Sequence, residues 1–429
     1  MRRRALFLVS VFLTFTHAPC FGQDEQNITL AEAEKIAIQN HPQIQVATYL
    51  ASAATARVQQ ARSAYYPQAY GSLTGVDAER NSRVAAGGLN NPIIFERYSN
   101  GVTVGQLLTD FGRTHELVKS SNYHAQARQE DVVATRADVV LQVDQSYFAV
   151  LKAQTVLQVA QKTVSTRQLV ADQVGALAKN KLKSGLDVSF ANVDLAQAQL
   201  LLVQAQNDLQ ASLADLSAAL GYATQRTFRL AEEPMPAAPP TELAALLQQA
   251  LQNRPELISQ RLDVNSAKSY ATAERDLWFP TITAVGTAGL TPYGADQLAP
   301  RYAAAGFNVN IPLFNGHLYG ALRSEADSQA QAQQQYLRTL QDRVVRDVQK
   351  AWLNANSAYQ RLSLTDQLLQ SATQALDLAQ ERYKLGLSSI IELSQAQLNE
   401  TQAEIAQAGA KYDYEAQLSA LNYQVGRMP

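Results

Sequence analysis

The sequence predicts a mainly α-helical fold with some β-structure, in which long coiled-coil helices and short β-hairpins occur twice. Three observations lead to this prediction: the composition, an internal duplication and a seven-residue apolar pattern. Of the 429 residues, 68 are Ala and 47 are Gln, which favour helices, whereas Gly and Pro number only 20 and 14. Charged residues make up 17% of the chain and the net charge is −2, so a basic nucleic-acid-binding surface is not expected.

The first 22 residues have the pattern of an export signal. Three arginines precede a short apolar run, which ends at small residues that suit cleavage after Gly22. The apolar run is too short to span a membrane as a helix. We expect residues 1–22 to be removed, which also removes Cys20, the only cysteine. A lipid anchor on Cys20 is the alternative, although Pro19 and His17 fit a lipidation motif poorly.

Short motifs of the first half return in the same order in the second half. The matched pairs are Asn40-His41-Pro42 with Asn253-Arg254-Pro255, Tyr65-Tyr66-Pro67 with Trp278-Phe279-Pro280, Phe111-Gly112-Arg113 with Asn315-Gly316-His317, Lys183-Ser184-Gly185-Leu186 with Lys384-Leu385-Gly386-Leu387, and Leu220-Gly221 with Val425-Gly426. An ordered set of this kind indicates an internal duplication. We expect one repeat at 23–231 and another at 241–429, joined by a proline-rich linker at 232–240.

Each repeat is expected to hold a β-hairpin followed by a helical hairpin. The β-hairpins are expected at about 67–111 and about 280–315, and the helical hairpins at about 113–221 and about 316–426. In the second β segment, polar and apolar residues alternate from Thr281 to Leu290. Strands with one apolar and one polar face are what a membrane barrel needs, although a sheet backed by solvent has the same pattern.

The helical segments carry a heptad pattern. Leu195, Leu202, Leu209 and Leu216 recur every seven residues, and a small residue lies three positions after each. A sustained heptad predicts coiled-coil packing, and small residues on the seam let the helices approach closely. The longest helices are expected at about 114–181 and 317–384, each flanked by two half-length helices placed end to end.

The strand count bears on the assembly. Four strands per chain do not close a barrel, since known barrels begin at about eight strands. Two chains would give eight strands and three would give twelve. Because about four helices per chain are expected in each cross-section, the matching count of twelve favours a homotrimer.

The duplicated Asn-x-Pro helix start, the aromatic-Pro strand entry, the Phe-Gly strand exit and the Gly-Leu helix turns resemble the TolC-like outer membrane efflux proteins (outer membrane factors). The resemblance covers essentially the whole exported chain. It implies a homotrimer with a 12-stranded barrel in outer membrane lipid and an α-helical tunnel in the periplasm. It also implies a periplasmic adaptor (membrane fusion) protein and an inner-membrane pump of the RND or ABC type as partners. The expected function is the passive exit duct of a tripartite efflux system or of a type I secretion system.

The resemblance implies two functional regions. The adaptor would contact the helical hairpin tips, which comprise Lys183, Ser184, Gly185, Leu186, Lys384, Leu385, Gly386 and Leu387. Glycine at a tip permits the positive φ of a tight helix exit, so helix capping alone is the alternative for Gly185 and Gly386. A periplasmic gate would comprise Tyr383, Ser388, Glu392 and Gln395.

The gate matches the family pattern only in part. Tyr383 keeps the gate tyrosine and Glu392 keeps one acidic ring, whereas Ser388 replaces an arginine and Gln395 replaces a second acid. A ring of Glu392 carboxylates would attract cations. Ser389 to Glu392 is also a capping-box sequence, so Glu392 can serve as a helix cap, as a lumen acid, or as both.

Sequence signatures of catalysis are missing from the chain. It has no phosphate-binding Gly-x-x-x-x-Gly-Lys motif, no His or Cys spacing typical of zinc sites, and no Gly-x-Ser-x-Gly nucleophile motif. We therefore expect a protein that is not an enzyme and needs no cofactor, metal or nucleic acid. The alternative from another class is a coiled-coil structural or adhesin-like envelope protein without a channel. That alternative predicts one anchor at a chain end, whereas here β segments interrupt the helices internally.

Overall fold

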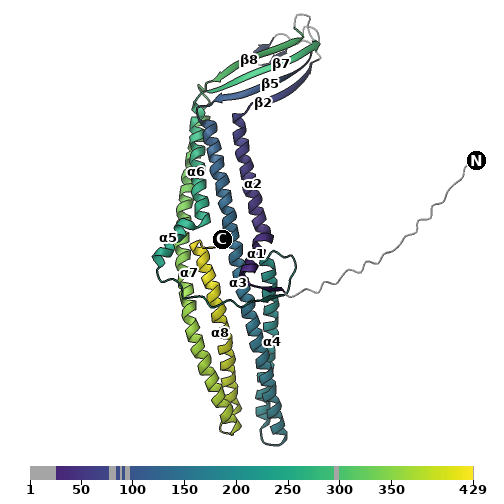
Figure 1. Cartoon of the computed structure of the whole chain (residues 1–429), viewed down its shortest axis with the longest axis vertical. Helices are drawn as coiled ribbons and strands as arrows, with labels where there is room; N and C mark the ends of the chain where they lie inside the picture. Colours follow the sequence, from purple (N-terminus) through teal and green to yellow (C-terminus); the bar gives the residue numbers. More distant parts are fainter. Residues whose placement is uncertain (1–25, 77–83, 87–88, 92–96, 294–298, 429) are drawn as a thin grey trace, which may run out of the picture.

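The computed structural model describes residues 26–76, 84–86, 89–91, 97–293 and 299–428. The molecule is elongated, with a β-sheet at one end of a bundle of long helices (Figure 1). The expected export signal lies outside the described residues. Among the described helices, none has a stretch long and apolar enough to cross a bilayer.

The helices occur as two matching sets of four. The first set is α1 (Leu30–Asn40), α2 (Pro42–Arg62), α3 (Arg113–Lys179) and α4 (Gly185–Ala219), and the second is α5 (Leu243–Asn253), α6 (Pro255–Arg275), α7 (Leu318–Lys384) and α8 (Ile390–Val425). Both long helices, α3 and α7, contain 67 residues. The duplication read from the sequence is therefore present in the helices.

Local sequence explains where the helices begin. Thr29 caps α1 through a complete capping box with Glu32. Proline occupies the first position of α2 and of α6, where its missing N–H costs nothing. Before each long helix, two consecutive residues adopt positive φ: Phe111 and Gly112 before α3, and Gly316 and His317 before α7. This shared turn redirects the chain from strand to helix.

The larger sheet joins both repeats. Its strands are β2 (Gln68–Val76), β5 (Arg97–Thr109), β7 (Thr281–Tyr293) and β8 (Arg301–Asn310). They are antiparallel in the order β2-β5-β7-β8. The central pairing of β5 with β7 connects two strands from different repeats, and Gly101 lies opposite Gly289 in this pairing. Strands β2 and β8 are left as sheet edges within the described chain.

Two smaller strand pairs complete the β-structure. Strands β3 (Val84–Ala86) and β4 (Leu89–Asn91), which follow β2 and precede β5 along the chain, form a separate short antiparallel pair. Strand β1 (Gln26–Ile28) pairs in parallel with β6 (Phe228–Leu230) beside the middle of the bundle. Neither pair was expected from the sequence.

Two glycines make room for an aromatic ring on the sheet. The Tyr302 side chain from β8 lies across Gly289 of β7 and reaches Gly101 of β5, where its hydroxyl donates to the Asn100 carbonyl at 3.4 Å. A Cβ atom at Gly101 or Gly289 would overlap the Tyr302 ring or its hydroxyl. The glycines are therefore required by packing, since aromatic rings cover strand glycines in this way.

We expect Gly289→Val to destabilise the sheet by about 1–3 kcal/mol, as overpacking usually does. The measurement is the thermal unfolding temperature of the purified protein in detergent. Gly286→Val, three residues earlier on the same strand, is the control, because a Cβ atom there meets nothing within 4 Å. Equal unfolding temperatures for the two variants would contradict this interpretation of Tyr302.

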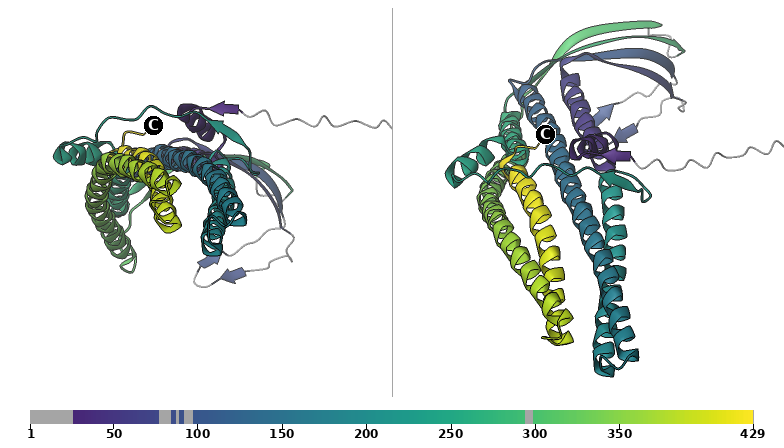
Figure 2. Two further views of the ribbon diagram at one scale, coloured as in Figure 1. Left: turned by 90° about the horizontal axis from the view of Figure 1, so that it is seen from below. Right: turned by 60° about the horizontal axis from the view of Figure 1, so that its bottom comes forward.

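The longer helices form a single curved row when the molecule is viewed from below, and the short helices α1 and α5 lie beside this row (Figure 2). Near the sheet the neighbours follow the order α2, α3, α6, α7, and in the lower half the order is α4, α3, α8, α7. Helices α2 and α4 thus succeed one another along α3, as the helix lengths predicted. Each cross-section contains four helices.

The predicted heptad seam is buried in part, since Leu195, Leu202 and Leu209 are half-buried. The small residues Ala198, Ala205 and Ala219 and the leucine Leu216 are all buried on α4 where it packs on α3. Partner positions Val143 and Val150 on α3 are fully buried. Alternating large and small side chains let helix backbones approach closely, which explains why the bundle needs few aromatic residues.

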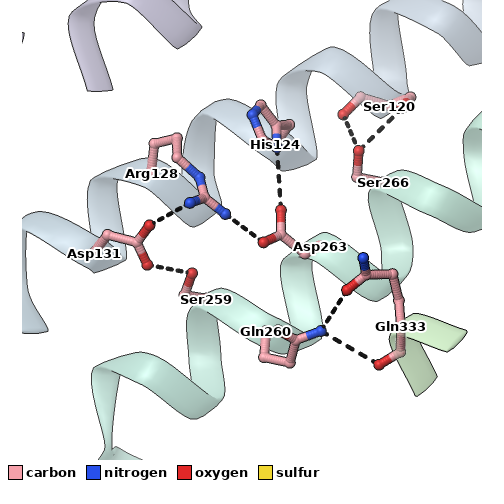
Figure 3. A network of polar contacts seen from close by, with 9 residues as sticks. All are labelled: Ser120, His124, Arg128, Asp131, Ser259, Gln260, Asp263, Ser266 and Gln333. Carbon is pink, nitrogen blue, oxygen red and sulfur yellow. Dashed lines mark hydrogen bonds and ion pairs between the residues drawn. The ribbon is translucent and has the colours of Figure 1, made fainter. Parts of the chain in front are cut away.

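A polar seam joins the two repeats below the sheet (Figure 3). Asp263 on α6 accepts from Arg128 on α3 and contacts His124 Nδ1 at 3.2 Å. Arg128 also pairs with Asp131 at 2.7 Å, and Asp131 accepts from the Ser259 hydroxyl at 2.6 Å. Because each charged group in this row has a partner of opposite charge, the seam fixes the register between α3 and α6.

Candidate functional site

The two helical hairpin tips lie side by side at the end of the bundle opposite the sheet (Figure 1). At the first tip, the chain leaves α3 at Lys179 and re-enters a helix at Gly185. At the second tip, it leaves α7 at Lys384 and re-enters at Ile390. The structure thus brings both sets of tip residues predicted from the sequence to one end of the molecule.

The equivalence of Gly185 and Gly386 was wrong. Gly386 has φ +72° and ends α7, whereas Gly185 is the first residue of α4 and has no positive φ. At the first tip Lys181 takes the left-handed position, with φ +63°. The Leu182 N–H bonds to the Leu177 carbonyl at 2.9 Å, and the Leu387 N–H bonds to the Arg382 carbonyl at 2.8 Å.

Structural equivalents at the tips are therefore 205 residues apart, the same spacing as between the starts of α3 and α7. The Lys-x-Gly-Leu motifs of the two tips are similar by coincidence. In the structure, the motif of the first tip lies four positions away from the residues that are equivalent to the motif of the second tip. The C-cap alternative consequently holds for Gly386 but not for Gly185.

Apolar side chains at both tips are open to solvent. Leu186 and Leu387, expected to contact the adaptor, are each 65% exposed, and Leu385 is 72% exposed. Leu182, which sequence reasoning missed, is 69% exposed. It lies directly before Lys183, at which the first tip predicted from the sequence begins. These four leucines expose apolar side chains to solvent at one end of the molecule. Exposed apolar side chains that lie together are typical of a surface that binds another molecule.

The first residues of α4 and α8 are capped differently. Ser184 and Asp187 form a complete capping box, in which Asp187 accepts from the Ser184 N–H at 2.9 Å. This backbone hydrogen bond lowers the pKa of Asp187. At the second tip, the Ser389 hydroxyl accepts from the Glu392 N–H at 3.4 Å, but the Glu392 carboxylate does not return to the Ser389 N–H.

The Glu392 carboxylate instead pairs with Arg382 across the hairpin, at 3.0 Å from Nε. Arg382 lies near the end of α7, and its equivalent near the end of α3 is Leu177, which offers no charge. This difference explains why only the first tip has a complete box. The pair could have been inferred from the sequence, because Arg382 and Glu392 are equally distant from the turn at Leu387.

Tyr383 lies between the two hairpins. It packs against a buried cluster with members from all four helices, which are Ala171, Val174, Ala191, Leu376, Ala379, Ile390, Leu393 and Ala396. Lys183 Nζ, from the other tip, lies 4.1 Å from the centre of the Tyr383 ring. This cation–π contact ties the tips together, and it was not foreseen, because Lys183 was assigned only to adaptor contact.

The remaining gate positions carry no charge. The Ser388 hydroxyl is buried without a hydrogen-bond partner, and Gln395 donates to Asn399 at 2.9 Å along α8. The residue before Gln395, Ser394 on α8, donates to Asp194 on α4. Near the tips, the hairpins are therefore joined by the Lys183–Tyr383 contact and by the Asp194–Ser394 contact.

A family model described as "Outer membrane efflux protein" matches residues 35–222 and 246–427. The chain belongs to this family. The match spans both repeats, and it supports an efflux protein over the alternative of a coiled-coil adhesin without a channel. As an outer membrane efflux protein, the chain is a transport protein of the outer membrane, and its helical part extends into the periplasm.

Individual relatives agree with this assignment. The chain is 26% identical to the outer membrane protein TolC of Vibrio cholerae, over 93% of this chain and 91% of the relative. It is 25% identical to the cation efflux system protein CusC of Escherichia coli, over 80% of this chain and 76% of the relative. A membrane protein from Pseudomonas aeruginosa has the same fold, with a TM-score of 0.81 at 19% identity, over 96% of this chain and 98% of that one.

Proposed function

We propose that this efflux protein is a homotrimeric, passive exit duct whose twelve strands close a barrel in outer membrane lipid. The observation that carries the proposal is the pair of open sheet edges, β2 and β8, in a four-stranded sheet. An open edge in lipid leaves backbone N–H and C=O groups without partners, so β8 of one chain must pair with β2 of the next.

Uncovered apolar side chains on the outermost helices support the same arrangement. Leu186, Val193 and Leu200 recur every seven residues on α4, and Val193 and Leu200 are 52% and 71% exposed. On α7, at the other end of the row, Leu364 and Leu368 are more than half exposed. A contact between α4 of one chain and α7 of its neighbour covers both stripes, and repetition of such a contact closes a ring.

The deciding experiment is the detergent-corrected mass of the protein extracted from outer membranes. A mass near three chains is expected. A stable monomer in detergent, with the same sheet, would overturn the shared barrel. A mass of two chains would instead require an eight-stranded barrel, whose interior side chains fill it, and would overturn the duct.

The tips suit docking of a periplasmic adaptor. Lys183, Ser184, Gly185 and Leu186 at one tip, with Lys384, Leu385, Gly386 and Leu387 at the other, combine exposed leucines with lysines. An adaptor would link the duct to an inner-membrane pump of the RND or ABC type, which supplies the energy. The duct itself has no catalytic role in this proposal. Cargo of a small-molecule pump and protein cargo of a type I system would use the same exit.

The gate proposal follows from the contacts between the tips. Tyr383 and Lys183 hold the two hairpins together, and Glu392 with Arg382 holds the second hairpin closed on itself. Gln395 leaves one acidic ring in place of two, and Ser388 lacks the positive charge of the arginine that it replaces. The Arg382–Glu392 pair replaces the salt link that Ser388 cannot make. Opening would require the first hairpin to separate from the second.

We expect Glu392→Gln to weaken block of the channel by multivalent cations about tenfold in single-channel recordings. Three carboxylates near a common axis attract such cations, and each amide removes one charge. Arg382→Gln is expected to strengthen the block, because it frees the carboxylate from its partner. Glu381→Gln is the control, since Glu381 pairs with Lys384 on an exposed surface. Block that is identical in the Glu392 variant would leave this carboxylate only as the partner of Arg382.

A further inference from the structure

A small pocket lies where the linker 232–240 crosses α1 and α8. Its volume is about 180 Å³, which is below the size of a pocket for a drug-sized ligand. The walls include the apolar side chains of Leu30, Phe148 and Pro234, with Glu233 from the linker and Glu415 from α8. The hairpin tips do not include this pocket, and none of the contacts described above uses it.

The pocket contains a carboxylate that the protein itself leaves without a partner. Glu415 is only 3% exposed, and neither of its carboxylate oxygens has a hydrogen-bond partner. Asp144, from α3, is also 3% exposed, and its Oδ1 has no partner. Polar groups buried to this degree are nearly always hydrogen-bonded, so both side chains require an explanation.

The charges around Glu415 are mostly of one sign. It faces Glu232 and Glu233 on the linker and Lys411 on its own helix, and Glu34 of α1 lies beside Asp144 of α3. The nearby cation, Lys411, is already paired with Glu232 at 3.0 Å. Among the ion pairs of the described chain, none includes Glu34, Asp144, Glu233 or Glu415.

A buried carboxylate in such surroundings must either hold a proton or meet a cation. Burial, with the neighbouring carboxylates, raises the pKa of Glu415 to about 7. Above neutral pH, Glu415 is therefore ionised and needs a positive charge within the pocket. Ser419 and Asn422, which also line the pocket, add polar atoms close to that charge.

We propose that this pocket binds a small organic cation, an alkylammonium or a guanidinium compound, whose charge lies against Glu415 and Glu233. The apolar walls suit a short alkyl chain, and the volume suits a group about as large as a lysine side chain. An organic cation fits better than a metal ion, because the described residues contain no group of three or more His, Cys, Asp or Glu side chains placed to hold one.

The test uses the full-length exported chain, purified from membranes in detergent, with isothermal titration calorimetry at pH 8. The probes are butylammonium and butylguanidinium, and butyrate is the anionic control. One cation per chain is expected. Glu415→Gln should weaken binding at least tenfold, and it should fold normally, because Gln has the shape of a protonated Glu and this side chain has no partner to lose.

Two controls define the site. Glu404→Gln removes a charge from the same helix, at a residue that pairs with Lys162 outside the pocket, and should leave binding unchanged. Binding should weaken about tenfold between pH 8 and pH 6, because a carboxyl with a pKa of about 7 is largely protonated at pH 6. A proton on Glu415 and a cation beside it compete for the same charge.

Several outcomes would overturn the proposal. They are equal affinity in the Glu415→Gln variant, equal heat with butyrate, or no saturable binding of either cation. Binding of a lysine-containing peptide without binding of free butylammonium would assign the pocket to a partner's side chain and would likewise overturn a small-molecule site. Because the measurement needs no adaptor or pump, its result is independent of the proposed duct function.

Discussion

Gly185→Glu is expected to abolish efflux while the protein still folds and reaches the outer membrane. Gly185 is the first residue of α4, its φ is not positive, and a Cβ atom there meets nothing within 4 Å. A carboxylate near a helix N-terminus is also favourable for the helix. Loss of efflux would therefore report a lost contact with the adaptor, and a central interface position typically costs about 2 kcal/mol or more. The measurement is drug resistance in a strain that depends on this duct.

Gly175→Glu is the matched control for this variant. Gly175 lies on α3 above the same tip, and it also has open space around its Cα atom. Resistance should remain unchanged there. Gly386 is a less informative position, because its φ of +72° means that any side chain strains the hairpin itself. Full resistance in the Gly185 variant, at normal protein levels, would remove this tip from the docking surface.

Cross-linking α4 to α8 is expected to close the duct. The Asp194→Cys/Ser394→Cys variant places thiols where two side chains now form a hydrogen bond between the hairpins. Oxidation should abolish transport if opening requires the hairpins to separate, and a reducing agent should restore it. The exported chain would contain no other cysteine, so the new disulfide has no competitor. Efflux and conductance are measured before and after reduction.

The matched control pair lies on the polar seam of Figure 3. Ser120 and Ser266 are in contact at 3.1 Å between α3 and α6, near the sheet rather than near the tips. A disulfide in the Ser120→Cys/Ser266→Cys variant should leave transport intact, because this seam stays closed in either state of the gate. Normal transport through a duct whose Asp194→Cys/Ser394→Cys disulfide is verified by mass would show that the hairpins do not separate.

Features with a short period along the chain were predictable from the sequence. The heptad of Leu195, Leu202, Leu209 and Leu216 predicted the α3–α4 seam, and the Thr29 capping box predicted the start of α1. The duplication was visible because short motifs such as Asn-x-Pro mark helix starts by local rules. In each case, the physical cause acts within about two helical turns, so the residues involved are close together in the sequence.

The candidate site shows where that reasoning fails. Matching Gly185 to Gly386 by similarity misplaced the first tip by four residues, because the left-handed position belongs to Lys181. A lysine in that conformation leaves no sequence signature, whereas Gly386 does. Glu392 was recognised as a cap and as an acid, but its partner Arg382 was missed, since capping-box reasoning considers only one helix end.

The sequence by itself determined the helices, the four strands of the larger sheet, the duplication and the efflux family of this protein. Only the tertiary structure decided which residues join the two repeats, for example β5 with β7, Lys183 with Tyr383, and Asp194 with Ser394. Each of these pairs joins residues from opposite halves of the chain. Local backbone preferences determine which segments become helices or strands, but contacts between distant segments depend on how whole helices pack. The role of a side chain such as that of Lys183 therefore depends on its neighbours in the folded protein, and these neighbours come from distant parts of the chain.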